Sequence, residues 1–323
     1  MSLTFGAAIP GTFALYYPRH AYQYDKFDTD QYYRIIWSSA LVVSALQWLL
    51  MGCVFRQETP VFLKQKGKEE ELLTLMKKYY KGNEVKNRID ALAVIKTEGN
   101  AEAQEVSIKE TFTDPEIRSS AWVGFWLVTF QQLTGINSVL FYSGQTFGDE
   151  NDGLSPAEAS CIINWANCLA AGIGAILLNY FGRKTLMIGS QLFCVIGMFG
   201  MWFFQEIVEQ DAAMMVLLIT FIFAFEFGSG PVVWLYLSEI CNDKATSVNT
   251  VVNWIWTLLV GAILPPILNN AMDGYVWLMF GCFSAIGFVY IAVTMKETMG
   301  VPKDKLKTLY NKSNKTADYD PIR

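Results

Sequence analysis

Residues 119–147 read SSAWVGFWLVTFQQLTGINSVLFYSGQTF, an apolar stretch without a single charged side chain. A bilayer core is crossed by about 20 apolar residues in helical form, so this stretch is long enough to span it. Backbone groups inside lipid must bond within their own segment, and the stretch lacks the alternation of a barrel strand. We therefore expect a membrane helix. It is unusual in carrying three amides near its middle, Gln131, Gln132 and Asn137.

Similar apolar blocks lie on both sides of this stretch, separated by short polar segments and one long one. The spacing predicts an all-α membrane protein, a multi-span helical bundle of about eight spans. These spans are Leu3–Tyr17, Tyr32–Phe55, Ser119–Phe147, Ala157–Leu178, Thr185–Gln205, Ala212–Leu237, Val248–Asn270 and Gly274–Met295.

The composition agrees with a membrane protein. Hydrophobic residues make up 52% of the chain and charged residues 17%, against about 25% charged in a typical soluble domain. The acids and bases of the long segment balance, which argues against a nucleic-acid arm. The six cysteines form no C-x-x-C pair, and one histidine, His20, cannot build a histidine-rich metal site. No nucleophile–base pair or phosphate-binding loop is recognisable, so we expect no enzyme, no cofactor and no metal.

Lysine and arginine are placed unevenly among the loops. They crowd the long segment 56–118, every second loop and the tail, whereas loops 148–156, 206–211 and 271–273 contain none and carry acids. By the positive-inside rule the basic set is cytoplasmic. Both chain ends then lie in the cytoplasm, which requires an even number of spans.

The three amides near the middle of the quoted stretch cannot all face one ligand on an ideal helix. At 100° per residue, Gln131, Gln132 and Asn137 point in widely separated directions. They can converge if the helix unwinds between them, and Gly135 is well placed for that. Amides suit a sugar because each offers two donors and an acceptor. The alternative, amides that join helices to one another by hydrogen bonds, stays open at this point.

Five motifs follow one another in a recognisable order. They are QETPVFL at 57–63, QQLTGIN at 131–137 followed by Phe141-Tyr142, NYFGRK at 179–184, EFGSGPVVW at 226–234 followed by Ser238-Glu239, and KETMG at 296–300. Together they resemble the signatures of the sugar porter family of the major facilitator superfamily. The resemblance covers the whole chain.

The resemblance implies that the predicted spans correspond to helices five to twelve of a twelve-helix fold. The first span offers only about 15 apolar residues, so we expect the chain to begin partway into a helix, lacking the first four. We divide the chain into four parts: 1–55, the last two helices of the N-terminal half-bundle; 56–118, a cytoplasmic connector with short helices; 119–295, a six-helix C-terminal half-bundle; and 296–323, a cytoplasmic tail.

The resemblance also assigns residues to a transport site. The implied substrate-binding residues are Gln131, Gln132, Asn137, Asn167, Glu226, Trp234 and Trp254, and the implied outer gate is Phe141 and Tyr142. A tryptophan can stack on a sugar ring, although a membrane tryptophan also serves as an interfacial anchor. The implied cytoplasmic charge lock is Glu58, Arg183, Lys184 and Glu239, residues that equally fit ordinary topology charges.

Two classes of function fit these expectations. The first is transport of a hexose-like monosaccharide by alternating access, as a uniporter or a proton symporter, with the sugar and the bilayer as partners and the plasma membrane as location. The second is a truncated membrane protein that no longer transports and has an interaction or regulatory role. A carrier of a non-sugar polyol is a further alternative.

Overall fold

The computed structural model describes residues 41–42, 44–54, 56–82, 84–90, 107–147, 156–208, 210–263 and 274–311. The predicted span Leu3–Tyr17, the first part of the next span and His20 lie outside the described residues. The described residues fall into two compact units, one before residue 107 and one from Ser107 onward.

The smaller unit contains the end of a predicted span and the connector. An apolar helical segment, Ser44–Val54, ends in a π-helical turn, η2 (Leu50–Val54). The described part of the connector forms short helices, α3 (Pro60–Gln65) and α4 (Glu69–Tyr79). They separate at Gly67, whose φ of 70° ends the first helix.

A small apolar cluster joins these connector helices. Its buried members are Leu63, Leu72, Leu75, Met76 and Val85. On α4 they fall at the spacing of one helix face, and the opposite face carries exposed glutamate and lysine.

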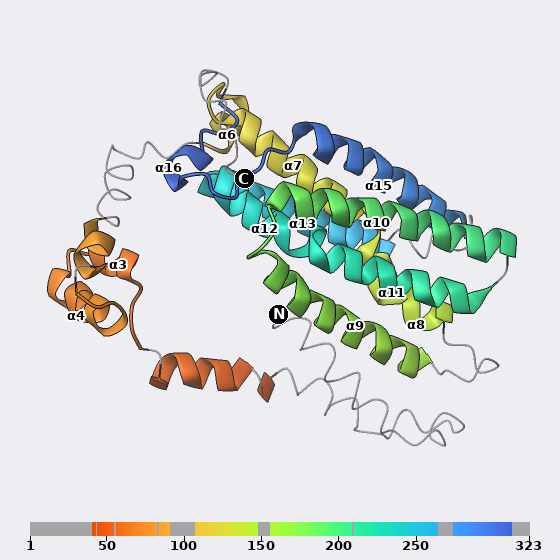
Figure 1. The fold of residues 1–323 in the computed structure, drawn as a ribbon, viewed down its shortest axis with the longest axis horizontal. Helices are drawn as coiled ribbons and strands as arrows, with labels where there is room; N and C mark the ends of the chain where they lie inside the picture. The colour runs from red at the N-terminus through yellow and green to blue at the C-terminus, as the bar shows by residue number, and fades with distance from the viewer. Residues whose placement is uncertain are drawn as a thin grey trace. The chain divides into compact units, whose positions relative to one another are not determined.

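The larger unit is a bundle of long helices (Figure 1). Its helices are α6 (Ile108–Thr113), α7 (Arg118–Leu133), α8 (Ile136–Phe147), α9 (Pro156–Leu177), α10 (Arg183–Phe203), η3 (Phe204–Val208), α11 (Asp211–Phe227), α12 (Ser229–Ile240), α13 (Asp243–Leu258), η4 (Leu259–Ile263), α15 (Tyr275–Thr294) and α16 (Lys303–Leu306).

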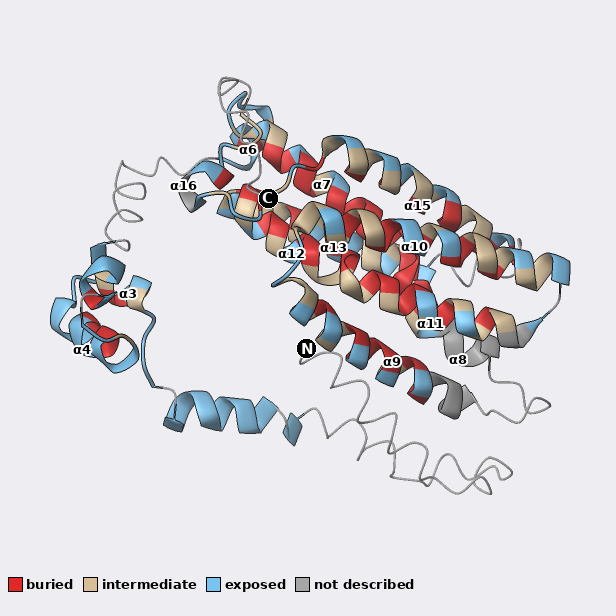
Figure 2. Cartoon of the chain, viewed as in Figure 1, coloured by how far each residue is buried: buried red, intermediate tan, exposed pale blue. Residues whose placement is uncertain are grey.

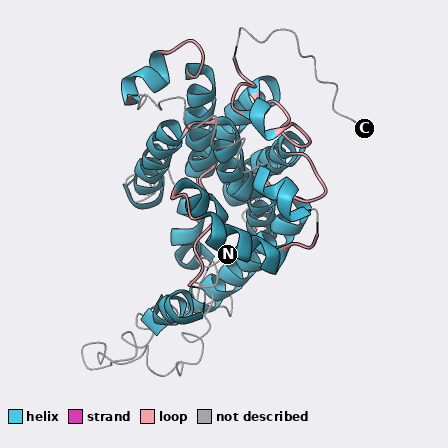
Figure 3. Cartoon of the chain, turned by 90° about the vertical axis from the view of Figure 1, so that its left-hand side faces the viewer, coloured by secondary structure: helices cyan, strands magenta, loops and turns pink. Residues whose placement is uncertain are grey.

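In the bundle, α10 packs against both α11 and α15, while α9 packs against α11 and α13 against α7. The turned view in Figure 3 shows helices and loops only among the described residues. Each predicted span from Ser119 onward is helical over its described residues, and two of them are interrupted; residues 264–270 of the span Val248–Asn270 lie outside the described residues. Four described helical stretches are long and apolar enough to cross a membrane: Arg183–Val208, Ala213–Ile240, Asp243–Ile263 and Tyr275–Thr294.

Two apolar clusters are stacked along the helices. We call the first the Phe280 cluster; it includes Leu133, Ile136, Val139, Cys194, Met201, Phe225, Val260 and Phe280. The second, the Tyr236 cluster, includes Val128, Met187, Val232, Tyr236, Leu237, Ala245, Ile291 and Met295. Figure 2 shows buried and exposed positions alternating along the long helices of this unit. Several exposed positions are large and apolar, such as Leu169, Ile196 and Val293, as lipid-facing surfaces require.

Candidate functional site

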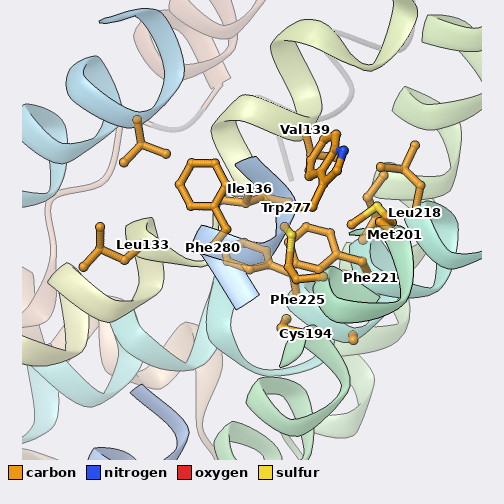
Figure 4. Close-up of a cluster of buried hydrophobic side chains, with 14 of the residues drawn as sticks. Leu133, Ile136, Val139, Cys194, Met201, Leu218, Phe221, Phe225, Trp277 and Phe280 are labelled. Carbon is orange, nitrogen blue, oxygen red and sulfur yellow. The ribbon is translucent and has the colours of Figure 1, made fainter. Parts of the chain in front are cut away.

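The predicted helix 119–147 is broken where the sequence indicated. Helix α7 ends at Leu133 and α8 begins at Ile136, and between them Gly135 has a φ of 84°. This left-handed conformation favours glycine. A Cβ built on Gly135 would lie 2.8 Å from the Phe280 ring. Figure 4 shows Leu133 and Ile136, from the two sides of the break, in one cluster with Phe280.

The break brings two of the predicted binding amides together. Asn137 Nδ2 donates a hydrogen bond to Gln132 Oε1 at 2.5 Å. The predicted unwinding at Gly135 is thereby confirmed, because a continuous helix would separate these side chains. Among the described residues, no hydrogen bond reaches Gln132 Nε2 or Asn137 Oδ1, so the pair keeps one open donor group and one open acceptor.

A second break separates α11 from α12 at Gly228. A Cβ built on Gly228 would lie 2.4 Å from Leu186 O and 2.6 Å from Ser190 Cβ, both on α10. The interruption therefore sits directly against a neighbouring helix, where only glycine fits. Glu226 precedes this break and Trp234 follows it.

Glu226 pairs with a second predicted binding residue. Asn167 Nδ2, on α9, donates to Glu226 Oε1 at 3.1 Å, and Asn167 is 5% exposed. Close approach of the two helices makes this contact reachable, since a Cβ on Gly174 would lie 2.2 Å from Glu226 O. Within the described part of the chain, Asn167 Oδ1 and Glu226 Oε2 accept no hydrogen bond.

Gln131 points away from the Gln132–Asn137 pair into a different network. Its Nε2 donates to Ser229 O at 2.7 Å and to Gly230 O at 3.2 Å, while its Oε1 accepts from Asn253 Nδ2 at 2.8 Å. Both ends of the Gln131 amide are thus used inside the protein. A sugar could contact Gln131 only by replacing one of these hydrogen bonds. Its role as a binding residue stays a prediction.

This network continues through α10 to α15. Ser229 N donates to Ser190 Oγ at 2.9 Å, and Ser229 Oγ donates to Gln191 Oε1 at 3.2 Å. Gln191 Nε2 donates in turn to Ser284 O at 3.2 Å. We call this set the mid-bundle polar layer: Gln131, Ser190, Gln191, Ser229, Asn253 and Ser284. Each member lies between Phe280-cluster and Tyr236-cluster residues of its own span.

Sequence reasoning assigned no role to Ser190, Gln191, Ser229 or Asn253. Two signals could have found them. Gln191 and Asn253 are amides inside predicted spans, where a polar group needs a partner. Ser229 follows Gly228, the glycine of a motif already thought to break the helix.

Three of the predicted aromatic residues are exposed on the larger unit. Trp234 is 40% exposed, Trp254 60% and Phe141 57%. The Phe141 ring lies against Gly261, where a Cβ would approach Phe141 Cε2 to 2.6 Å. Among the described residues, no hydrogen bond or ring contact joins Trp234 or Trp254 to the amides. The side chain of Tyr142 lies outside the described residues.

Part of the predicted cytoplasmic charge lock forms an ion pair. Arg183 Nη2 lies 3.1 Å from Glu239 Oε1, and both side chains are largely buried, at 19% and 15% exposure. Glu239 Oε2 also accepts from Thr298 Oγ1. Lys184 contributes its backbone N–H rather than a charge contact. Glu58 belongs to the smaller unit and is exposed.

The tail residue Glu297 supports this pair from the start of α10. Its carboxylate accepts from the backbone N–H groups of Arg183, at 2.9 Å, and Lys184, at 3.1 Å. A carboxylate at a helix N-terminus satisfies unpaired donors and complements the helix dipole. Tyr236 also binds the start of this tail, because its hydroxyl donates to Lys296 O at 2.8 Å.

Comparison with known proteins shows which protein family the chain matches. The family model described as "Sugar (and other) transporter" matches residues 4–310. Facilitated trehalose transporter Tret1 of Apis mellifera ligustica is 30% identical over 256 residues, covering 75% of this chain and 50% of that protein. Hexose transporter 1 of Plasmodium falciparum is 26% identical over 279 residues, covering 83% of this chain and 55% of that protein. The chain thus spans about half the length of the curated relatives it matches.

A solved structure shares the fold. The proton:xylose symporter XylE bound to 6-bromo-6-deoxy-D-glucose, of the major facilitator superfamily, superposes with a TM-score of 0.76 at 21% identity, covering 95% of this chain and 64% of that chain. The predicted fold class, a helical membrane bundle of the major facilitator type, is confirmed.

Proposed function

This chain belongs to the sugar (and other) transporter family, and on that basis we propose that it carries a hexose-like sugar across a membrane by alternating access. It is a multi-pass membrane protein. Half of the relatives' length is not represented in it, so the activity of the whole protein is our proposal. The hydrogen-bonded pairs Gln132–Asn137 and Asn167–Glu226, formed by four of the predicted binding residues, are the observations that support it most directly.

The chemistry of these two pairs fits a polyhydroxylated neutral solute. Each pair is bonded internally through one group on each side chain, which fixes its orientation. The remaining Gln132 Nε2 can donate, and Asn137 Oδ1, Asn167 Oδ1 and Glu226 Oε2 can accept. A sugar hydroxyl does both, so a ring of hydroxyls can satisfy all of them. Trp234 and Trp254 offer exposed indole faces for stacking.

Alternating access follows from the interrupted helices. In carriers of this kind the substrate lies between two half-bundles that rock about it, with broken helices presenting polar groups. The breaks at Gly135 and Gly228 supply such groups on α7–α8 and α11–α12. The Arg183–Glu239 pair would hold the cytoplasmic helix ends together and would have to open for release to the cytoplasm.

Uptake by the reconstituted chain tests the proposal. The protein is placed in liposomes and uptake of radiolabelled D-glucose, D-xylose and trehalose is measured. We expect saturable uptake of at least one monosaccharide, abolished by an excess of the unlabelled sugar. Uptake no faster than in protein-free liposomes, together with no sugar binding by the purified chain, would instead support a membrane protein with an interaction or regulatory role.

Two finer points belong to the same proposal. Proton coupling is tested by imposing a pH gradient: a symporter accumulates sugar above its external concentration, whereas a uniporter only equilibrates it. We place the protein in the plasma membrane, and fractionation of cells expressing it tests that location. If a linear polyol inhibits the uptake of labelled glucose as strongly as unlabelled xylose does, the substrate class is broader than hexoses.

The Arg183–Glu239 pair gives a stability prediction. Glu239→Gln removes the charge partner of a guanidinium whose Nε already lacks a hydrogen bond. Leaving one charge of a buried pair alone costs about 3 kcal/mol, which lowers Tm by roughly 5–10 °C in a protein of this size. Thermal unfolding of the purified protein measures it.

An exposed pair provides the matched control for this change. Lys68 and Glu71 lie 2.9 Å apart with side chains 52% and 58% exposed, and exposed pairs contribute little. Glu71→Gln is therefore expected to leave Tm within about 1–2 °C of the wild type. Equal Tm values for Glu239→Gln and the wild type would contradict the buried-pair account, whereas partial recovery in an Arg183→Met/Glu239→Gln double variant would support it.

A further inference from the structure

Ser190 and Gln191 are adjacent polar residues in the middle of an otherwise apolar helix, α10. They are 3% and 0% exposed, and neither belongs to the sugar site proposed above. Removing such groups from water is unfavourable unless they are fully hydrogen-bonded. Their partners therefore indicate what they do.

Both side chains bind the first residue of α12. The Ser229 N–H, which the start of a helix leaves without an intrahelical partner, donates to Ser190 Oγ at 2.9 Å. The Ser229 hydroxyl lies 2.9 Å from the Ser190 hydroxyl and donates to Gln191 Oε1 at 3.2 Å. The other end of the Gln191 amide is also held, because its Nε2 donates to Ser284 O on α15 at 3.2 Å.

The same residue of α12 also holds the site amide. Ser229 O accepts from Gln131 Nε2 at 2.7 Å, and Gln131 Oε1 accepts from Asn253. The hydrogen-bonded chain therefore runs from Ser284 through Gln191, Ser229 and Gln131 to Asn253, across α15, α10, α12, α7 and α13. Any shift of the first turn of α12 would move the Gln131 amide with it.

The first turn of α12 also lies close to two other predicted binding residues, Glu226 and Trp234. Gly230 lies beside Glu226, since a Cβ on Gly230 would be 3.3 Å from Glu226 Oε2. Trp234 lies one turn further along α12 and is 40% exposed. The turn packs closely against α10, because a Cβ on Gly228 would meet both Leu186 O and Ser190 Cβ.

We propose that Ser190 and Gln191 are positioning residues of the sugar site: through Ser229 they fix the first turn of α12, and thereby the Gln131 amide and the Glu226 and Trp234 side chains. This inference rests on the proposed function. Helix–helix adhesion alone would use the same hydrogen bonds, but it would change stability without changing affinity for the sugar.

The test compares Gln191→Met and Ser190→Ala with Ser284→Ala. The Ser284 hydroxyl is buried without a hydrogen bond, and only its backbone carbonyl accepts from Gln191. Ser284→Ala therefore removes a polar atom from the same layer and keeps the network. Glucose uptake into proteoliposomes gives KM and maximal rate, and hydrogen exchange of the backbone amides of 229–234 reports on the turn without any sugar.

For Gln191→Met and Ser190→Ala we expect KM to rise about five- to tenfold, the effect of one lost hydrogen bond, with little change in maximal rate. Exchange of the 229–234 amides should quicken in both variants and not in Ser284→Ala. Gln191→Glu, which keeps the acceptor for Ser229 Oγ, should recover part of the KM.

A double variant tests whether Gln191 affects KM through the Gln131 side chain. Because Gln191 acts in part through Gln131, the KM of the double variant Gln191→Met/Gln131→Ala should rise by less than the product of the two single effects. Additive effects, or an unchanged KM with only a lower Tm, would overturn the proposal. If the wild type transports no sugar, the proposed function fails. If hydrogen exchange of the 229–234 amides is unchanged in Gln191→Met and Ser190→Ala, the positioning role of Ser190 and Gln191 is refuted, whether or not the protein transports sugar.

Discussion

Replacing Gly135 by alanine should abolish sugar uptake and sharply reduce the yield of folded protein. The residue has a φ of 84°, and a Cβ there would lie 2.8 Å from two atoms of the Phe280 ring. A left-handed conformation costs a non-glycine residue about 1–2 kcal/mol, and overpacking adds about 1–3 kcal/mol. Phe280 is fully buried, so its ring has no room to move aside.

The functional loss has a separate cause. Any relaxation toward a continuous helix would carry Asn137 away from Gln132 and dissolve the pair that supports the proposed site. Uptake into proteoliposomes and thermal unfolding in detergent measure the two effects. Uptake is expected to fall to the level of empty liposomes even in the fraction that folds.

Gly172→Ala, in α9, is the matched control. A Cβ there meets nothing within 4 Å, and alanine favours a helix interior over glycine by about 1 kcal/mol. This variant is expected to keep full uptake with an equal or higher Tm. Wild-type uptake and Tm in Gly135→Ala would show that the break is not required.

Gln132→Ala should raise the KM for sugar by roughly 30-fold, a loss of about 2 kcal/mol, the net value of about two hydrogen bonds. The change removes the open Nε2 donor and also the acceptor that orients Asn137. Gln132 is 6% exposed, so thermal unfolding of the variant is measured beside uptake to separate a loss of folded protein from the change in KM. Initial rates over a range of sugar concentrations measure the effect.

Thr129→Val, on the same helix, provides the comparison. The Thr129 hydroxyl is buried and has no hydrogen-bond partner, so its replacement by a methyl group removes no interaction and should leave KM unchanged. Asn137→Ala combined with Gln132→Ala should be less than additive, since the two amides act as a pair. Equal KM values for Gln132→Ala and Thr129→Val would contradict the placement of Gln132 at the sugar.

The membrane bundle could be predicted from local sequence properties. Apolar length predicted the helices from Ser119 onward, because the hydrocarbon core admits few other backbone arrangements. The break at Gly135 was also accessible, since three amides at incompatible helical angles flank the one residue type that adopts a left-handed conformation freely. The motifs named Arg183 and Glu239 among four possible charge-lock residues, but which of the four would pair with each other was not predicted.

The partners of those amides were not accessible, and the reason is geometric. Gln131 and Gln132 are neighbours in the sequence, yet Gln132 bonds Asn137 five positions away, whereas Gln131 bonds Asn253, 122 positions away. Hydropathy and glycine placement are local properties that set where helices lie and break. Rotation of each helix about its axis, which decides whether an amide faces a sugar or another helix, is fixed only when α7, α10, α12, α13 and α15 pack together. The same packing gave Ser190 and Gln191 their partners, which no local pattern could have indicated.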